Sequence, residues 1–322
     1  MKELFNLGEL YVSDFLGEND EPRGGKVEMK MLLDEKTGNV RLETPAPLNV
    51  MYGKYWYRSG INQSMKNELK RIVDSILDVK KLKENDIWVD IACNDGTMFD
   101  FIPNNLIKIG IDPVDDSYAK ESEKRANLIS QDYFTAESYK KSKFGSQKAK
   151  VVTSIAMFYD LEEPQKFIKD VGEILDDNGL WVLQLSYTPL IIEQLAFDNI
   201  CHEHIYYYSL FNLKKLMESN GFKVVDCQLN DTNGGSFRVY VMKENSDITK
   251  FATQPHRDVC NFRIQSLLTY EEKLKLDSVE TWLDFYNRIL ELKEKKIPFI
   301  IRRPLPNRGS EYWYVEDLEV II

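Results

Sequence analysis

The chain has 322 residues and a formal net charge of −10, with 43% hydrophobic and 29% charged residues. This composition is typical of a soluble globular protein with one large domain and an appendage, or with two domains. The acidic balance argues against nucleic acid as the main partner, because no broad basic face is expected.

Targeting signals and metal motifs are not visible in the sequence. No apolar run approaches the roughly 20 residues that span a bilayer, and the N-terminus lacks the apolar stretch of a secretory signal. The cysteines form no CxxC pair. We therefore predict a cytoplasmic protein with free thiols, no membrane partner and no bound metal.

The first 60 residues predict a small β-rich unit. Alternation over residues 27–31 and 40–44, with a turn between them, is typical of a hairpin. Residues 62–82 follow with apolar side chains at helical spacing, which predicts one amphipathic helix.

From Ile87 onward, predicted strands and helices alternate. The spacing favours a parallel sheet with helices on both faces, and the clearest helix covers residues 164–175. The five predicted strands are residues 87–92, 106–111, 127–130, 149–155 and 180–187.

Two further predicted strands, residues 222–229 and 236–242, are joined by a tight turn and so pair antiparallel. Five parallel strands closed by such a hairpin predict an α/β fold with the Rossmann-like sheet of class I methyltransferases. We expect three parts: a β-rich N-terminal unit (1–60), a cofactor-binding domain (61–245) and a helical C-terminal extension (246–322).

The turn after the first of these strands discriminates between two cofactors. A dinucleotide fingerprint needs glycine at places now held by Ala92, Asn94 and Thr97. A site for S-adenosylmethionine (SAM) needs small or left-handed residues at alternate places, and these are Ala92, Asn94 and Gly96. The sequence therefore favours SAM over NAD, with a βα turn in some other α/β protein as the remaining alternative.

Carboxylates follow the next two strands. Asp112 lies 22 residues after Asp90, where a carboxylate can hold ribose hydroxyls. Asp132 ends the third strand, where it either faces the adenine amine or caps the next helix. The predicted cofactor-binding residues are Asp90, Ala92, Asn94, Gly96, Asp112, Pro113, Asp132 and Tyr133.

The segment Asp198–Tyr208 holds two of the three histidines of the chain. If the segment is extended, His202 and His204 point the same way and Glu203 points the opposite way. Imidazole has a pKa suited to a general base near neutrality. A metal chelate and a polar loop packed under tyrosines are the alternatives. We take His204, Glu203 and His202 as candidate catalytic residues.

Two more clusters suit a polar ligand. Aromatic and cationic residues at 52–58 precede the long helix, and the turn at 233–238 carries an arginine, although a simple hairpin turn is an equal interpretation of the latter. The predicted substrate-binding residues are Tyr55, Tyr57, Tyr187, Tyr208, Asn233 and Arg238.

Four motifs together resemble one family. The motifs are Asp90–Thr97, Tyr159–Pro164, Phe197–His204 and Asn233–Arg238, and in this order they resemble SAM-dependent sugar C-methyltransferases, which act on nucleotide-linked 4-ketosugars. The resemblance covers roughly residues 45–245. It implies that His204 is the general base, that Glu203 lies beside it, and that the partner is a small sugar substrate.

The chain departs from that family at three points. Cys201 stands where the family has a tyrosine, the four-cysteine zinc site near the N-terminus is missing, and the second C-terminal Rossmann-like domain is missing or vestigial. Two alternatives to C-methylation stay open. One is an O-methyltransferase, and the other is a SAM-binding or sugar-binding module without turnover.

Overall fold

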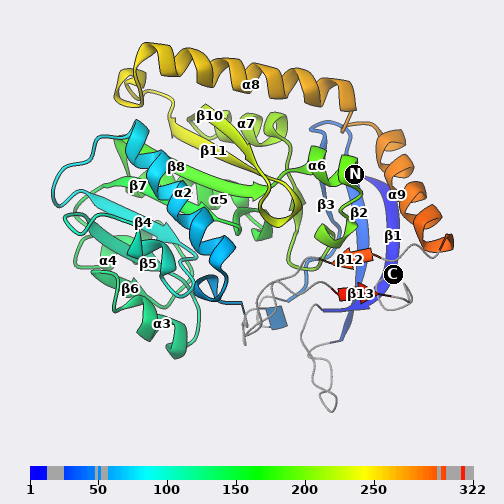
Figure 1. The fold of residues 1–322 in the computed structure, drawn as a ribbon, viewed down its shortest axis with the longest axis horizontal. Helices are drawn as coiled ribbons and strands as arrows, with labels where there is room; N and C mark the ends of the chain where they lie inside the picture. The colour runs from blue at the N-terminus through cyan, green and yellow to red at the C-terminus, as the bar shows by residue number, and fades with distance from the viewer. Residues whose placement is uncertain (13–24, 48–49, 52–56, 296–298, 302–312, 316–322) are drawn as a thin grey trace.

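The computed structural model describes the chain except residues 13–24, 48–49, 52–56, 296–298, 302–312 and 316–322. Tyr55, a predicted substrate contact, lies outside the described residues. The described chain forms a large α/β lobe and a smaller lobe built on a second sheet (Figure 1). None of the helices in the described part of the chain has the length and apolarity that crossing a membrane requires.

The large lobe is built on a seven-stranded sheet in the order β10-β11-β8-β7-β4-β5-β6. Strand β11 runs antiparallel to both of its neighbours, and the other pairings are parallel. This confirms the predicted methyltransferase-type sheet, closed by the β10–β11 hairpin. The strands are β4 (Ile87–Ile91), β5 (Ile107–Ile111), β6 (Leu128–Ser130), β7 (Ala149–Ile155), β8 (Leu175–Ser186), β10 (Phe222–Asn230) and β11 (Ser236–Lys243).

Helices cover both faces of this sheet. Apolar side chains of α4 (Ala136–Lys141), α5 (Pro164–Ile174) and α7 (Leu210–Glu218) share one core with the strands. Helix α2 (Gln63–Val79) packs its apolar stripe on the opposite face. Short helix α3 (Asp116–Ser122) follows β5.

Helix α8 (Gln254–Leu274) lies along the edge strand β10, above the sheet in Figure 1. Its Cys260 belongs to the core under α2, whereas its Ile264 belongs to the core under α7. The C-terminal extension therefore closes both cores at the β10 edge.

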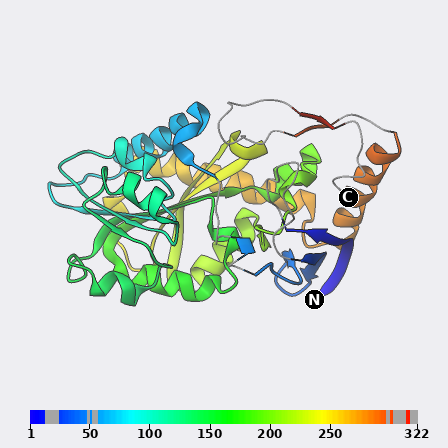
Figure 2. The ribbon, with the colours of Figure 1, turned by 90° about the horizontal axis from the view of Figure 1, so that it is seen from below.

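The small lobe is a four-stranded antiparallel sheet in the order β1-β2-β3-β9. Its strands are β1 (Lys2–Tyr11), β2 (Lys26–Asp34), β3 (Asn39–Leu42) and β9 (Tyr206–Tyr207). Helices α6 (Thr188–Gln194) and α9 (Val279–Glu294) share its apolar core. Figure 2 shows these N-terminal strands in blue beside the large lobe, with α9 in orange on their outer side.

Strand β9 joins the two lobes. It follows the predicted catalytic segment directly and pairs with β3, so that Arg41 faces Tyr206 and Val40 faces Tyr207. The N-terminal sheet is thereby completed by residues from the middle of the chain. A further two-stranded sheet pairs β12 (Phe299–Ile301) with β13 (Trp313–Val315).

One predicted helix is much shorter than expected. The chain after β4 forms only a 3-10 turn, η2 (Thr97–Asp100), before it enters β5. Pro103 follows closely, and proline cannot continue a helix because it lacks the amide hydrogen.

Candidate functional site

The turn after β4 adopts the backbone that the sequence predicts. Ala92, Asn94 and Gly96 all have left-handed backbone, with φ of 60°, 52° and 73°. A side chain on Gly96 would meet the backbone of Ser122 at 2.8 Å, because α3 packs directly on the turn. The alternate left-handed residues bring the turn against both β5 and α3.

Asp112, at the end of β5, is tied to this turn. Its carboxylate accepts hydrogen bonds from the backbone N–H of Asn94 at 2.7 Å and of Val114 at 3.2 Å. The side chain is only 7% exposed, and this burial raises the pKa of Asp112 to about 6. The carboxylate is therefore fixed in orientation and changes charge close to neutral pH.

Asp90 lies deeper than Asp112. It is 4% exposed and accepts a 2.6 Å hydrogen bond from the Thr153 hydroxyl on β7. Burial raises the pKa of Asp90 to about 7. Its placement joins β4 to β7 beneath the turn.

The residues predicted near the adenine lie at the surface. Pro113, Asp132 and Tyr133 are all exposed. The Asp132 carboxylate accepts from the N–H of Tyr133 at 2.8 Å. The interpretation of Asp132 as a helix cap is wrong, because Thr135 caps α4 and forms a capping box with Ser138.

The segment before α2 is hydrogen-bonded to the turn after β4. The side chain of Asn94 accepts from the N–H of Ser59 at 2.9 Å and donates to the carbonyl of Tyr57 at 2.9 Å. Asp95 accepts from the N–H of Gly60 at 2.8 Å. A side chain at Gly60 would lie 2.8 Å from the Asp95 carboxylate. Gly60 and Asp95 are not among the site residues that the sequence predicts. The available signal in the sequence is the Ser-Gly pair ahead of the long helix.

Tyr57 itself is partly buried, and its burial together with the charge of Asp95 raises its pKa to about 12. The next residue, Arg58, lies over the Tyr118 ring at 3.9 Å and pairs with Glu121 at 3.0 Å. Both residues border the turn, as expected for the edge of the sheet where ligands bind.

The predicted catalytic segment is a turn and not an extended strand. The N–H of His204 donates to the carbonyl of Cys201 at 3.1 Å. The two histidines consequently face different partners, and the prediction that they point the same way is wrong.

His204 lies over the loop that follows β7. Its ring centroid is 4.2 Å from that of Tyr159. Its Nδ1 is 2.8 Å from the carbonyl oxygen of Asn199. A carbonyl only accepts, so Nδ1 carries the proton and the neutral ring has its lone pair on Nε2. Glu203, beside it, is half-buried.

His202 faces the small sheet. Its Nε2 lies 3.3 Å from the carbonyl of Val27, to which it donates, and the side chain is 3% exposed. Burial lowers the pKa of His202. The structure thus corrects its assignment as a catalytic residue, because the ring fixes the turn onto β2.

The histidine pair is also not brought together as a chelate. Among the described residues, the atoms close enough to share a metal belong to Asp226, His256 and Cys260, within 4.8 Å of one another. Arg263 already donates to both oxygens of Asp226, at 2.9 and 2.6 Å. The guanidinium supplies the positive charge there, and a divalent cation beside it would be repelled. The absence of a bound metal stays a prediction.

Two predicted substrate contacts are engaged inside the protein. Arg238 is 5% exposed and pairs with Glu68 on α2 at 2.6 Å. Tyr187 is fully buried and donates to Glu271 on α8 at 2.7 Å. Their polar atoms are hydrogen-bonded to buried carboxylates. The structure therefore corrects the prediction that these two side chains contact a ligand.

Two further predicted substrate contacts, Asn233 and Tyr208, differ in exposure. Asn233 is exposed in the hairpin turn with φ of 52°. Tyr208 is 3% exposed, and its hydroxyl has no hydrogen-bond partner among the described residues. Its ring lies 5.5 Å from Phe158, next to the loop that carries Tyr159.

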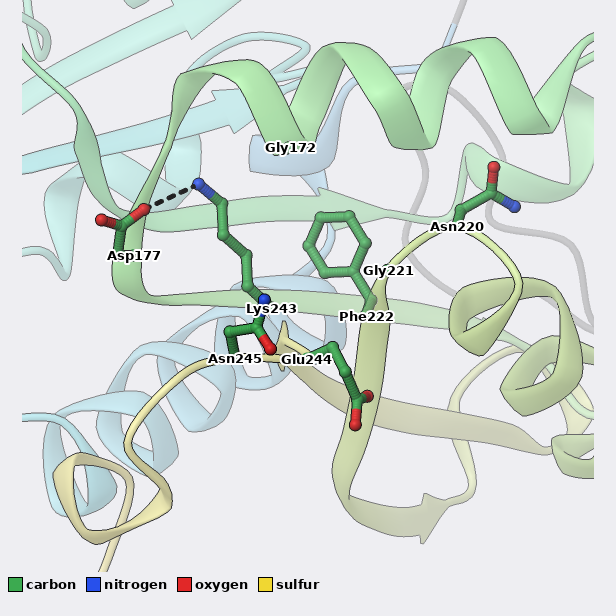
Figure 3. A pocket seen from close by; sticks show the side chains of 8 residues that line it. All are labelled: Gly172, Asp177, Asn220, Gly221, Phe222, Lys243, Glu244 and Asn245. Atoms are coloured by element: carbon green, nitrogen blue, oxygen red, sulfur yellow. Dashed lines mark hydrogen bonds and ion pairs between the residues drawn. The ribbon is translucent and has the colours of Figure 1, made fainter.

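A surface hollow of about 460 Å³ lies elsewhere (Figure 3). It is lined by the start of β10 and the end of β11, and the Lys243–Asp177 ion pair at 3.3 Å crosses it. None of the predicted site residues lines this hollow. It opens where β11 ends, at the amino-terminal ends of the parallel strands. The turn after β4 lies at their carboxyl-terminal ends, so this hollow is not the candidate site.

Comparisons with known proteins agree with this fold. A family model described as a methyltransferase domain matches residues 61–226, slightly more than half of the chain. C-methyltransferase NovU of Streptomyces niveus is 24% identical over 236 residues, which are 73% of this chain and 56% of the relative. The chain thus spans little more than half the length of that curated relative.

Two solved methyltransferase structures superpose on slightly more than half of this chain. A SAM-dependent methyltransferase from Clostridium acetobutylicum superposes with a TM-score of 0.41 at 10% identity, over 55% of this chain and 92% of that one. Magnesium protoporphyrin IX methyltransferase from Synechocystis, with bound S-adenosylhomocysteine, has a TM-score of 0.40 at 12% identity, over 56% and 82%.

Proposed function

The chain belongs to the methyltransferase domain family, and from this premise we propose that it methylates a carbon atom of a sugar, a nucleotide-linked ketosugar, through an enolate. The observation that carries the proposal is the 2.8 Å contact between Nδ1 of His204 and the carbonyl oxygen of Asn199, beside the loop after β7. This contact assigns the proton to Nδ1 and the lone pair of the neutral ring to Nε2. The similarity to a C-methyltransferase over most of this chain supports it.

SAM is the cofactor of this enzyme, and when bound it supplies an electrophilic methyl group. The residues at the turn fit such a ligand. Asp112 offers a buried, oriented carboxylate for ribose hydroxyls, and the left-handed residues Ala92, Asn94 and Gly96 open the backbone for close approach. Asp132 and Tyr133, exposed at the end of β6, are proposed to border the adenine.

The chemistry requires a base. A carbon next to a ketone becomes nucleophilic only after it loses a proton. In the proposal, Nε2 of His204 takes this proton, and the electron pair moves to the ketone oxygen to give the enolate. Bound SAM would then supply its methyl group to the enolate carbon and would leave as neutral S-adenosylhomocysteine. The carbonyl of Asn199 holds the imidazolium that forms, because it accepts the Nδ1 proton throughout.

Isotope labelling tests the reaction type. The protein is incubated with SAM that carries a ¹³C-labelled methyl group and with a nucleoside-diphosphate-linked 4-ketosugar, and the product is read by carbon NMR. A label bonded to ring carbon supports the proposal. A label on oxygen would establish the O-methyltransferase alternative instead. Tight SAM binding with no transfer to any ketosugar would favour the non-catalytic binding module.

A further inference from the structure

The guanidinium of Arg41 on β3 is half-buried, and no carboxylate of the described residues forms an ion pair with it. Six of the eight arginines in the described part of the chain lie within 4.0 Å of a carboxylate, and the exceptions are Arg41 and Arg257. The protein carries a net charge of −10, so carboxylates are abundant. A partly desolvated cation without a carboxylate is costly unless something else compensates it.

Arg41 is held in one orientation by neighbours on β3 and β9. Its Nε donates to the carbonyl of Leu42 at 2.9 Å, and its Nη1 donates to the Tyr206 hydroxyl at 3.0 Å. The guanidinium also lies 4.9 Å from the centre of the Tyr206 ring. These contacts use two of the five N–H groups and leave three for a ligand.

Arg41 lies beside the segment that carries His204, because β3 pairs with β9. Val40 and Leu42 point into the core of the small lobe, so Arg41 points to the other side. Across the ladder it faces Tyr206, which follows His204 by two residues. The N–H of Leu42 donates to the carbonyl of Ile205 at 2.9 Å, and this fixes β3 beside the candidate base.

A second polar group in this cluster lacks a partner. The Tyr208 ring stacks on Tyr206 with centroids 5.7 Å apart, and the charge of Arg41 acts on its phenol. The Tyr208 hydroxyl is buried without a hydrogen-bond partner among the described residues. A buried donor without an acceptor destabilises the protein unless a water or a ligand supplies one.

We propose that Arg41 binds an oxyanion of the acceptor substrate, a phosphate group, while His204 acts on the sugar. This inference rests on the proposed function, because it assigns a residue to the same site. A planar guanidinium matches phosphate oxygens in a bidentate arrangement, and stacking on Tyr206 presents it already ordered. Arg41 is thus the specificity residue that distinguishes a phosphorylated substrate from the free sugar.

Calorimetry with inorganic pyrophosphate tests the proposal without any turnover. The protein is saturated with S-adenosylhomocysteine, and the wild type is compared with Arg41→Gln, Arg41→Lys and the matched control Arg257→Gln. A charge-assisted hydrogen bond contributes enough for Arg41→Gln to weaken pyrophosphate about 10–150-fold. Arg41→Lys should keep part of the affinity, and Arg257→Gln should leave it within about twofold. If Arg257→Gln weakened pyrophosphate binding as much as Arg41→Gln does, the effect would come from the net charge alone. That result would overturn the assignment of Arg41 as the phosphate-binding residue.

Steady-state kinetics supply the second arm. With a nucleotide-linked substrate, Arg41→Gln should raise KM about 10-fold or more and leave kcat and the SAM affinity unchanged. With the corresponding uncharged sugar, the variant should match the wild type. Wild-type protein that binds no pyrophosphate, or an Arg41→Gln protein that binds it as the wild type does, would refute the proposal. A product methylated on oxygen would refute the proposed reaction and leave the role of Arg41 intact.

Discussion

In the proposed site, Asp112 is the residue whose charge should most directly affect cofactor binding. A carboxylate accepts two ribose hydrogen bonds only when it is ionised. Burial raises its pKa to about 6, so the apo protein begins to protonate it just below neutral pH. The structure thus connects one buried side chain to a measurable pH dependence.

We predict that the affinity for SAM is constant above about pH 7 and falls by up to tenfold per unit below pH 6. The sign follows from the raised pKa, because the folded apo protein binds a proton there that the cofactor must displace. In Asp112→Asn the affinity should be about 10–150-fold weaker at neutral pH and should lose this dependence. Calorimetry between pH 5 and 8 measures both. A variant that retains the wild-type profile would assign the proton to another group, such as Asp90.

Arg238 is assigned to stability and not to substrate binding. The side chains of Arg238 and Glu68 are 7% and 2% exposed, and removal of one partner leaves the other charge buried. We predict that Arg238→Met lowers the free energy of unfolding by about 3–5 kcal/mol and that the double variant with Glu68→Met recovers much of it. Urea titration with both variants measures the difference. A stable Arg238→Met protein with only a raised KM would restore the substrate role.

At the scale of elements, α8 is hydrogen-bonded to the residue that follows β8 and to the first turn of α7. The carboxylate of Glu271 accepts from the Tyr187 hydroxyl and from the N–H groups of Leu210 and Phe211, at 2.7, 2.6 and 2.8 Å. It therefore caps α7 from another helix, and a negative charge is favourable at that helix N-terminus. The catalytic segment runs between these two fastened elements.

We predict that Glu271→Ala lowers the stability of the protein by at least about 2 kcal/mol, because three donors, two of them buried, lose their acceptor. Glu271→Gln should cost less, since one acceptor oxygen remains. Chemical denaturation of the two variants gives the ranking, with Glu272→Ala, on the exposed side of α8, as the control. Equal stability of Glu271→Ala and the control would show that the α7 cap is dispensable.

The sequence predicted elements that rest on local patterns. The parallel sheet followed from the alternation of predicted strands and helices, and the turn after β4 followed from the small or left-handed residues Ala92, Asn94 and Gly96. The pairing of β9 with β3 joins residues about 165 positions apart, as Arg41 and Tyr206 do. No local pattern records such a contact, so the completion of the small sheet could not be predicted.

The predicted site failed where polar residues have distant partners. Arg238 and Tyr187 carry groups that suit ligands, and only the fold reveals that Glu68 and Glu271 already bind them. The sequence predicts that His202 and His204 point the same way only if their segment is extended. The hydrogen bond from the N–H of His204 to the carbonyl of Cys201 turns the chain there, so the two rings contact different partners.

At the scale of the whole molecule, the two lobes meet at the proposed catalytic segment. In the proposal, the large lobe supplies the turn that binds the cofactor, the small lobe supplies Arg41, and His204 lies on the chain that passes between them. This arrangement predicts that loss of His204 affects turnover and leaves cofactor binding intact. His204→Asn should lower kcat by about 10²–10⁴ and change the SAM affinity by no more than a few-fold.

Solvent deuterium exchange tests the central claim most directly. The protein is held in D₂O with S-adenosylhomocysteine and a nucleotide-linked 4-ketosugar, and deuterium at the carbon next to the ketone is followed by proton NMR. Proton abstraction by His204 predicts exchange by the wild type that disappears in His204→Asn, although both proteins bind S-adenosylhomocysteine equally. Exchange that persists in His204→Asn would contradict the assignment of the base. Methyl transfer by the wild type without any exchange would contradict the enolate.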